Sequence, residues 1–325
     1  MKVLVLGVSG HVGNAIARAL LDHGHQVTGV NRSRRRAFNL KNLAIRRLIG
    51  DIPTAPLDRW MRGHDLVIDA AAPYPLALSS SSADTARLVE AATRRTHALL
   101  RAAQRQSIPL IYISSFVTLG QLRYGLDRVL SQVIRWLHPY FAVKTRIEQL
   151  LIAARRRRQD LAIVNLTGCL GPWDCKAPAR CFVPALLNGK LPASTDQMLN
   201  VIDVRDVALN LIGLLNADLP PAPLALVGHN ISNDMLFRWI CEIGGAKPPP
   251  LVTPTAAGIL ATYFTEAAAT RLGLAPPLPA LIAMLTYLHG FMTPSPSQID
   301  LGIKLRPLSA TLDDTVRWYR SIGYC

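Results

Sequence analysis

The chain has 325 residues, half of them hydrophobic, with five cysteines and a formal net charge of +15 at pH 7. A chain of this length can bury a sizeable core, as one large domain or as a domain with a smaller companion. Its longest uncharged apolar stretches, near residues 256–264 and 279–288, are too short to cross a bilayer, which excludes a membrane-spanning protein.

The start of the chain and its cysteines both indicate a reducing compartment. Met1 leads directly into the first predicted strand, so we expect no signal peptide and a cytoplasmic protein. Cys169, Cys175 and Cys181 are spaced six residues apart, but no CxxC pair or group of histidines accompanies them. We therefore expect no metal site.

Arginines gather in short groups along the chain, at 34–36, 46–47, 94–95 and 155–158. A basic surface of this kind could attract nucleic acid or an anionic membrane face. The same groups are typical of exposed helix ends and loops that face water. Because no aromatic residues interleave with them, we expect no nucleic-acid partner and at most weak contact with a membrane surface.

Residues 1–32 predict a strand, a glycine-rich turn and a helix, in that order. The run KVLVL at 2–6 is typical of a buried parallel strand, GVSGHVG follows at 7–13, and residues 14–22 carry apolar side chains at helical spacing. Gly7 permits the tight turn, Gly10 lets the backbone approach a pyrophosphate, and Gly13 lets the helix pack close to the strand. We favour this phosphate site over a turn that binds nothing, because the strand and the helix stand on the required sides.

The second predicted strand, residues 26–30, ends in Asn31, Arg32 and Ser33. A carboxylate at this place would hold the adenosine ribose hydroxyls of NAD and repel a 2′-phosphate. The amide, guanidinium and hydroxyl found here suit the extra phosphate of NADP instead. A solvated basic loop is the alternative, since three more arginines follow. NADP(H) is therefore favoured, with NAD as the second choice.

Further strands and helices alternate after this point. Residues 44–48 predict a short third strand, 65–72 a fourth strand ending in small residues, 84–106 a helix, and 109–113 a fifth strand that runs into Ser114 and Ser115. This alternation predicts a doubly wound parallel sheet.

Three residues with reactive side chains follow that pattern. Tyr140 and Lys144 are four residues apart, so they share one face of a helix, and Ser115 stands at the carboxyl end of a parallel strand. A Tyr-x-x-x-Lys spacing occurs by chance on ordinary helices. Its position 25 residues after the serine, in a chain that opens with a cofactor loop, favours a catalytic set.

These motifs together resemble the extended short-chain dehydrogenases/reductases, the superfamily of nucleotide-sugar epimerases, dihydroflavonol reductases and 3β-hydroxysteroid dehydrogenases. The resemblance covers essentially the whole chain, because further matches occur at Leu170-Gly-Pro172, at 200–207 and in the C-terminal segment 301–324. Within the superfamily, residues 171–178 and 187–193 resemble the dihydroflavonol-reductase-like and hopanoid-associated epimerase-like branch.

The resemblance implies a Rossmann-type, doubly wound parallel sheet with a smaller, mostly helical C-terminal lobe. We place the NADP-binding domain at residues 1–167, with 199–216 returning to it, and the substrate lobe at 168–325, where prolines begin to recur. The residues implied to contact the cofactor are Gly7, Ser9, Gly10, His11, Val12, Gly13, Asn31, Arg32, Ser33, Asp51, Ile52, Ala70, Ala71, Tyr140, Lys144, Leu166 and Cys169.

Ser115, Tyr140 and Lys144 are the implied catalytic residues. Tyr140 would donate a proton to a carbonyl oxygen, or accept one in the reverse direction. A free tyrosine has a pKa of about 10, and Lys144 would lower that pKa while holding the nicotinamide ribose hydroxyls. Ser115 would hydrogen-bond the same carbonyl oxygen and stabilise its developing charge.

The chain departs from the family pattern at several positions. Asn165-Leu166 stands where Arg-Pro is usual, and Asp69 stands where His or Asn ends the fourth strand. The following helix lacks the usual Asn near Ala91 and has Arg94-Arg95 in place of Gly-Thr. The polar link behind the catalytic lysine is therefore missing or is replaced, with Glu90 or Thr93 as the candidates.

Two apolar segments of the chain allow two interpretations. Residues 116–136 are long and amphipathic, and Tyr263, residues 278–288 and Phe291 form a second apolar group. Both groups could be core or a dimer face, or the wall of a site for a hydrophobic substrate. Core packing is favoured for the second group, and the first is left open.

The function expected from the sequence is NADP(H)-dependent reduction of a carbonyl on a fairly lipophilic small molecule, or oxidation of the alcohol. An NAD-dependent nucleotide-sugar epimerase or dehydratase is the first alternative, and a non-catalytic dinucleotide- or RNA-binding relative is the second. Ser115, Tyr140 and Lys144 argue against the non-catalytic relative, and Arg32 argues against the epimerase. A homodimer is compatible with the sequence.

Overall fold

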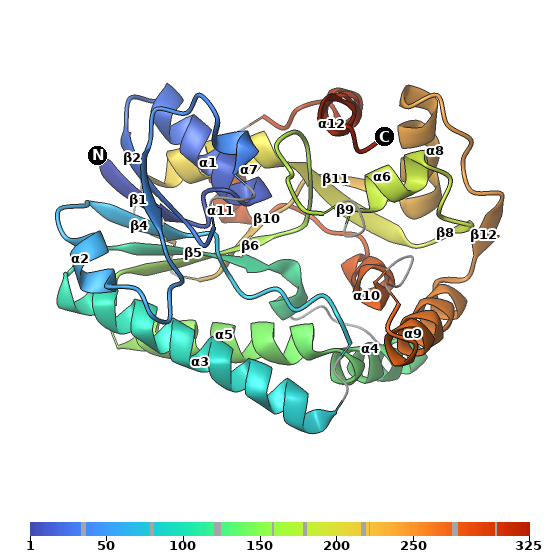
Figure 1. Cartoon of the computed structure of the whole chain (residues 1–325), viewed down its shortest axis with the longest axis horizontal. Helices are drawn as coiled ribbons and strands as arrows, with labels where there is room; N and C mark the ends of the chain where they lie inside the picture. The colour runs from blue at the N-terminus through green and yellow to red at the C-terminus, as the bar shows by residue number, and fades with distance from the viewer. Residues whose placement is uncertain are drawn as a thin grey trace.

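A seven-stranded parallel sheet forms the centre of the molecule (Figure 1). The computed structural model describes residues 1–33, 37–78, 81–119, 125–157, 159–177, 181–215, 219–220, 222–274, 279–302 and 304–325. The strand order is β10-β6-β5-β4-β1-β2-β3. The strands are β1 (Lys2–Leu6), β2 (Gln26–Asn31), β3 (Arg46–Ile49), β4 (Leu66–Asp69), β5 (Leu110–Ser115), β6 (Leu161–Leu166) and β10 (Leu224–Leu226).

The order of the strands reverses between β1 and β4, which confirms the predicted doubly wound, Rossmann-type sheet. In such sheets ligands bind beyond the carboxyl ends of the strands at the point of reversal. Gly7, Ala70 and Ser115 all lie at those ends, so the fold brings the predicted cofactor loop and the predicted catalytic serine to one edge.

Helices cover both faces of this sheet because alternate residues of each strand point to opposite sides. Val3 and Val5 of β1 belong to one apolar cluster, and Leu4 and Leu6 belong to the other. The first cluster is covered by α1 (His11–Asp22) and α7 (Val204–Leu215), and the second by α2 (Leu57–Met61), α3 (Ser82–Arg105) and α5 (Pro139–Arg156).

Most of the remaining elements form a second lobe beside the carboxyl edge of the sheet (Figure 1). A small sheet pairs β7 (Gly168–Leu170), β9 (Met198–Asp203) and β11 (His229–Ser232), and another pairs β8 (Ala193–Thr195) with β12 (Leu251–Thr253). The helices of this region are α4 (Gly125–Leu137), α6 (Phe182–Leu187), α8 (Asn233–Ile243), α9 (Thr255–Arg271), α10 (Ala280–His289) and α12 (Leu308–Ser321). Helix α11 (Pro296–Asp300) packs instead against β10 of the main sheet. Short 3-10 turns occur at η1 (Phe38–Leu40) and η2 (Phe116–Thr118).

The segment expected to return to the main sheet, residues 199–216, is divided between the two parts. Its strand, β9, pairs with β7 and β11 in the small sheet. Its helix, α7, packs against α1 over the main sheet, with Val207 and Leu211 in the same apolar cluster as Ile16. This segment is therefore one of the connections between the two parts of the molecule.

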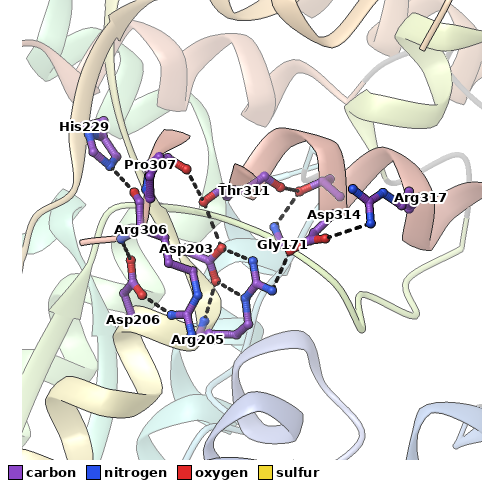
Figure 2. Close-up of polar contacts among 11 residues, drawn as sticks. Gly171, Asp203, Arg205, Asp206, His229, Arg306, Pro307, Thr311, Asp314 and Arg317 are labelled. Carbon is purple, nitrogen blue, oxygen red and sulfur yellow. Dashed lines mark hydrogen bonds and ion pairs between the residues drawn. The ribbon is translucent and has the colours of Figure 1, made fainter. Parts of the chain in front are cut away.

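Figure 2 shows how the C-terminal helix is fixed to that segment. Arg205 lies between two carboxylates, 2.6 Å from Asp203 and 2.6 Å from Asp314 of α12. Thr311 of α12 donates to Asp203 at 2.8 Å, and the backbone N–H of Arg306 donates to Asp206 at 2.7 Å. Asp203 is buried, and its pKa is lowered because the Arg205 contacts outweigh the cost of burial.

Candidate active site

The glycine loop is packed so closely that side chains would not fit. Gly7 has a φ of 83°, and its N–H donates to the carbonyl of Val30 at 2.8 Å. A Cβ on Gly7 would lie 2.9 Å from the backbone of Ala70, and a Cβ on Gly13 would lie 2.3 Å from the carbonyl oxygen of Gly7. The loop, the end of β4 and the start of α1 therefore form one tight cradle.

Helix α1 begins at His11, directly after Gly10, so its first-turn N–H groups lie at the cradle. His11 is buried, and burial lowers its pKa, which keeps the ring neutral beside the loop. Ser9 accepts a hydrogen bond at its carbonyl from the Asn39 amide at 3.1 Å. Val12 is half-buried on the same turn. All four predicted contacts thus lie in or beside the cradle.

The predicted phosphate-selecting residues lie at the end of β2. The Asn31 amide is buried and donates to the carbonyl of Ser33, so it holds the turn, and its Oδ1 has no partner among the described residues. Arg32 and Ser33 are exposed. Asp51 and Ile52 come beside them because Gly50 donates to the Asn31 carbonyl at 3.2 Å. The arginines at 34–36 lie outside the described residues.

Ser115, Tyr140 and Lys144 come together at the carboxyl edge. Ser115 is the last residue of β5, paired with Leu166 of β6, and Tyr140 and Lys144 lie in the first turns of α5. The Tyr140 side chain is close enough to Ser115 for a hydrogen-bonding interaction. Lys144 Nζ lies 5.7 Å from the centroid of the Tyr140 ring.

Burial decides the protonation of this set. Tyr140 and Lys144 are 1% and 4% exposed. Burial and the neighbouring Tyr74 raise the pKa of Tyr140, against the opposing influence of Ser115. Burial lowers the pKa of Lys144 to about 8. Loss of water disfavours the charged forms of both groups in the protein without cofactor, and the expected lowering of the Tyr140 pKa by Lys144 stays a prediction.

Behind Ser115 lies a buried polar network that sequence reasoning missed. Glu148 accepts hydrogen bonds from the hydroxyls of Ser114, at 2.8 Å, and Thr118. The Asn165 amide donates to Thr118 Oγ1 at 2.7 Å, to the Ser115 carbonyl at 2.9 Å and to Glu148 at 3.1 Å. Asn165 thus replaces the family's arginine with an amide that fixes the Ser115 backbone. Glu148, four residues after Lys144, was the available signal.

A second buried network joins two of the departures from the family pattern. Both terminal nitrogens of Arg95 donate to the carboxylate of Asp69 at 2.8 Å, and Asp69 also accepts the Ala71 N–H at 3.0 Å. The candidates Glu90 and Thr93 are wrong as the replacement for the polar link. Glu90 is exposed and pairs with Arg94, and Thr93 donates to the carbonyl of Val89 at 2.8 Å.

The remaining predicted contacts lie around these networks. Ala70 and Ala71 close the cradle against Gly7. Leu166 ends β6 opposite Ser115, and Cys169 follows in β7. Burial raises the pKa of the Cys169 thiol to about 12, so it stays neutral at physiological pH. The structure therefore places a neutral thiol, rather than a reactive thiolate, at this side of the site.

A segment after β7 covers the cradle, which sequence reasoning also missed. The Trp173 carbonyl accepts from the Asn39 amide at 3.0 Å, and the Arg18 guanidinium lies 4.5 Å above the Trp173 ring. Asp174 pairs with Lys176 at 2.8 Å and accepts from the Tyr319 hydroxyl at 3.1 Å. This segment ties α12 to the glycine loop.

Tyr140 faces an apolar wall built from both segments whose role was left open. One buried cluster contains Tyr140 together with Phe116 and Ile134 from the first segment and Leu281 and Met284 from the second. The Tyr74 ring meets the Tyr140 ring edge-on at 4.9 Å between centroids. Both segments therefore contribute to the surroundings of the predicted proton donor.

The chain is similar to known proteins over most of its length. The NAD dependent epimerase/dehydratase family matches residues 3–217. A Synechocystis sp. protein assigned as a dihydroflavonol 4-reductase is 29% identical over 329 residues, 98% of this chain and 95% of the relative. Sterol demethylase protein B of Methylococcus capsulatus is 24% identical over 267 residues, 78% of each chain.

Two crystal structures are similar over nearly the whole chain. That of gox2253 has a TM-score of 0.78 and 26% sequence identity, and covers 99% of both chains. That of PA4631, a nucleoside-diphosphate-sugar epimerase from Pseudomonas aeruginosa, has a TM-score of 0.75 and 21% identity, and covers 100% of this chain and 99% of the other. The second likeness shows the fold alone.

Proposed function

Because the chain belongs to the NAD-dependent epimerase/dehydratase family, whose members are NAD(P)-dependent oxidoreductases of the extended short-chain dehydrogenase/reductase type, we propose that it reduces the carbonyl of a lipophilic molecule with NADPH. The reverse oxidation of the alcohol uses the same residues. The observation that carries the proposal is the apolar cluster around Tyr140. A proton donor set in such a wall suits a substrate that is itself apolar.

The residues at the carboxyl edge fit a dinucleotide. The cradle of Gly7 and Gly13 excludes a Cβ, so a pyrophosphate can approach the backbone at the start of α1. Arg32 is exposed at the end of β2 and would form a charge-assisted contact with a 2′-phosphate. Lys144 would hold the nicotinamide ribose hydroxyls. The nicotinamide supplies the hydride chemistry when it is bound.

Tyr140 is the group that moves the proton. In reduction, its hydroxyl donates to the substrate oxygen as negative charge develops there, and the Ser115 hydroxyl donates a second hydrogen bond to the same oxygen. The high pKa of Tyr140 keeps the phenol protonated before the reaction, as a donor requires. In oxidation, Tyr140 accepts the proton of the alcohol, and the charge of Lys144 stabilises the phenolate.

The second lobe supports a reductase over a nucleotide-sugar epimerase. An epimerase of this superfamily needs basic groups there for the sugar diphosphate. Three of the basic residues are already paired with carboxylates: Lys176 with Asp174, Arg205 with Asp203 and Asp314, and Arg238 with Asp234. Arg180 lies outside the described residues. Of the relatives, one is named for a reductase and one for a sterol demethylase, and both names fit a lipophilic substrate.

The test is NADPH consumption by the purified protein with a panel of lipophilic ketones and aldehydes, such as terpenoid, steroid-like and polyketide compounds. We expect turnover that is lost in Tyr140→Phe, and no binding or epimerisation of UDP- or GDP-sugars. Mass spectrometry of the purified protein identifies any retained cofactor. A tightly held NAD, together with a melting temperature raised by a nucleotide sugar, would establish the epimerase instead.

A further inference from the structure

Helix α4 presents apolar side chains to water. Val129, Val133 and Trp136 are spaced by four and three residues, so they share one face of the helix. Their exposed fractions are 55%, 44% and 83%. A helix of a water-soluble protein ordinarily turns such a face inward. On α4, Ile134 points inward, into the cluster around Tyr140, while a second apolar stripe points outward.

Helix α9 has the same property. Leu260 and Phe264 are one turn apart and are 57% and 65% exposed, and the chain continues into exposed Leu272 and Leu274. The one carboxylate of α9, Glu266, is turned inward, where it accepts the backbone N–H of Leu78 at 3.0 Å and that of Ala280 at 2.7 Å. The outer side of α9 therefore presents apolar residues and ends in the basic Arg271.

The two helices occupy the same corner of the molecule (Figure 1). Ile134 of α4 and Ile259 of α9 belong to the buried cluster that contains Tyr140, so both helices pack on that cluster from outside. We call the outer apolar residues of α4 and α9 the apolar corner: Val129, Val133, Trp136, Leu260 and Phe264. Exposed apolar residues gathered on two helices that share one buried cluster are typical of a contact site.

We propose that the apolar corner docks on the surface of an anionic lipid bilayer. An exposed tryptophan and phenylalanine beside aliphatic side chains are the residues that enter the boundary between headgroups and acyl chains. The formal charge of +15 attracts the chain to anionic lipids, whereas it repels a second copy of the same chain. Charge therefore favours the bilayer over self-association as the occupant of this corner.

The proposal also gives the lipophilic substrate a route. The cluster on which α4 and α9 both pack contains Tyr140, so the apolar corner lies outside the surroundings of the predicted proton donor. A substrate dissolved in the bilayer would reach the site along these helices. This route rests on the proposed function, but docking does not, because vesicle binding is measured without cofactor or substrate.

The first experiment is sedimentation of the full chain with vesicles of phosphatidylcholine alone or with about one-third phosphatidylglycerol. We expect binding to the anionic vesicles that weakens as salt is raised. An aspartate on each helix of the corner, Trp136→Asp with Phe264→Asp, should lower that binding about tenfold or more. The matched control is Met235→Asp with Trp239→Asp, which places the same charges on exposed residues of α8 and should bind like the wild type.

The second experiment measures quenching of tryptophan fluorescence by brominated lipid. Trp136→Phe should lose most of the quenching and Trp239→Phe should keep it, and neither change puts a charge into the protein. Equal quenching in the two variants would overturn the proposal. Binding that is indifferent to lipid charge would overturn it as well. A dimer of the wild type in ultracentrifugation would also overturn the proposal, if Trp136→Asp with Phe264→Asp dissociates that dimer and the wild type binds no vesicles.

Discussion

Asp69 and Arg95 form a bidentate ion pair whose two N–O distances are both 2.8 Å, with side chains 0% and 7% exposed. Each residue departs from the pattern of the family, and each is the partner of the other. Asp69 also accepts the Ala71 N–H, and the alanines it positions lie against Gly7. The pair therefore holds the backbone after β4 in the position where it packs against the glycine loop.

Breaking this pair on one side should be costly. Arg95→Met leaves the Asp69 carboxylate buried without its partner, which should lower the free energy of unfolding by about 3–5 kcal/mol. The double variant with Asp69→Asn should recover a large part of that loss, because no charge remains to be buried. Urea denaturation measures both. Arg94→Met is the matched control, since it removes an exposed pair with Glu90 worth about 1 kcal/mol or less. Equal losses for Arg95→Met and Arg94→Met would contradict the argument.

Lys144 should cost the protein stability at neutral pH. Its folded pKa of about 8 lies below the value of a free lysine, so between pH 8 and 10.5 the unfolded chain binds the extra proton and stability rises with pH. Lys144→Met should therefore stabilise the cofactor-free protein by about 2–3 kcal/mol at pH 7, and this advantage should vanish as the pH rises through that window. Thermal melts across pH check it, with exposed Lys190→Met as the control. A Met variant no more stable than the wild type at pH 7 would refute the prediction.

His138 should make the start of α5 sensitive to acid. Its Nδ1 accepts the N–H of Tyr140 at 3.2 Å, and burial lowers its pKa to about 4. Between pH 6.5 and 4 the unfolded chain takes up a proton that the folded chain does not, so stability falls as the pH falls, by about 2–3 kcal/mol in all. His138→Asn keeps a capping acceptor without titrating and should lose this slope. Exposed His97→Asn should keep it. The measurement is urea denaturation at several pH values.

Arg32 should decide between the two cofactors. If its guanidinium meets the 2′-phosphate, Arg32→Ala should weaken NADPH binding by roughly 1.5–3 kcal/mol and leave NADH binding nearly unchanged. Titration of both variants with both cofactors checks this, with the exposed Arg62→Ala as a charge-matched control. Equal affinity of the wild type for NADH and NADPH would remove the assignment.

Tyr140 should be needed for turnover and not for binding. Tyr140→Phe keeps the ring in its apolar cluster and removes the proton donor, so kcat should fall by about a hundredfold or more while NADPH still binds. Tyr324→Phe removes a phenol hydroxyl from the C-terminal tail and serves as the control. Near-normal turnover of Tyr140→Phe on any substrate of the wild type would take Tyr140 out of the mechanism.

The parts of the site that are local in sequence could be predicted from it. Residues 2–13 carry the strand, the turn and the helix start within a dozen residues, and the spacing of Tyr140 and Lys144 follows from the pitch of one helix. The end of β5 was expected at residue 113, but the strand continues through Ser115 because its pairing with β6 extends to Leu166. That extension depends on a neighbour far along the chain.

The contacts that could not be predicted join residues distant in sequence. Asp69 and Arg95 each look like an isolated departure, and only the packing of α3 on the sheet makes them a pair. Glu148 and Asn165 meet Thr118 for the same reason, since three elements must be placed before the bonds exist. The pKa of Tyr140 was expected to fall from charge alone. The spacing of residues in the sequence does not show how deeply a side chain is buried. Burial is the largest influence on the Tyr140 pKa, and it raises that pKa.

One edge strand of the main sheet, β10, comes late in the chain and is therefore made late by the ribosome. β10 pairs with β6, yet it follows much of the second lobe in the chain, and α7, which covers α1, also comes after residue 167. A chain cut at 167 would leave the β6 edge unpaired and the apolar surface around Ile16 uncovered. The nucleotide-binding half therefore cannot mature during synthesis until most of the protein has emerged, and it cannot be exchanged between relatives as a self-contained cassette.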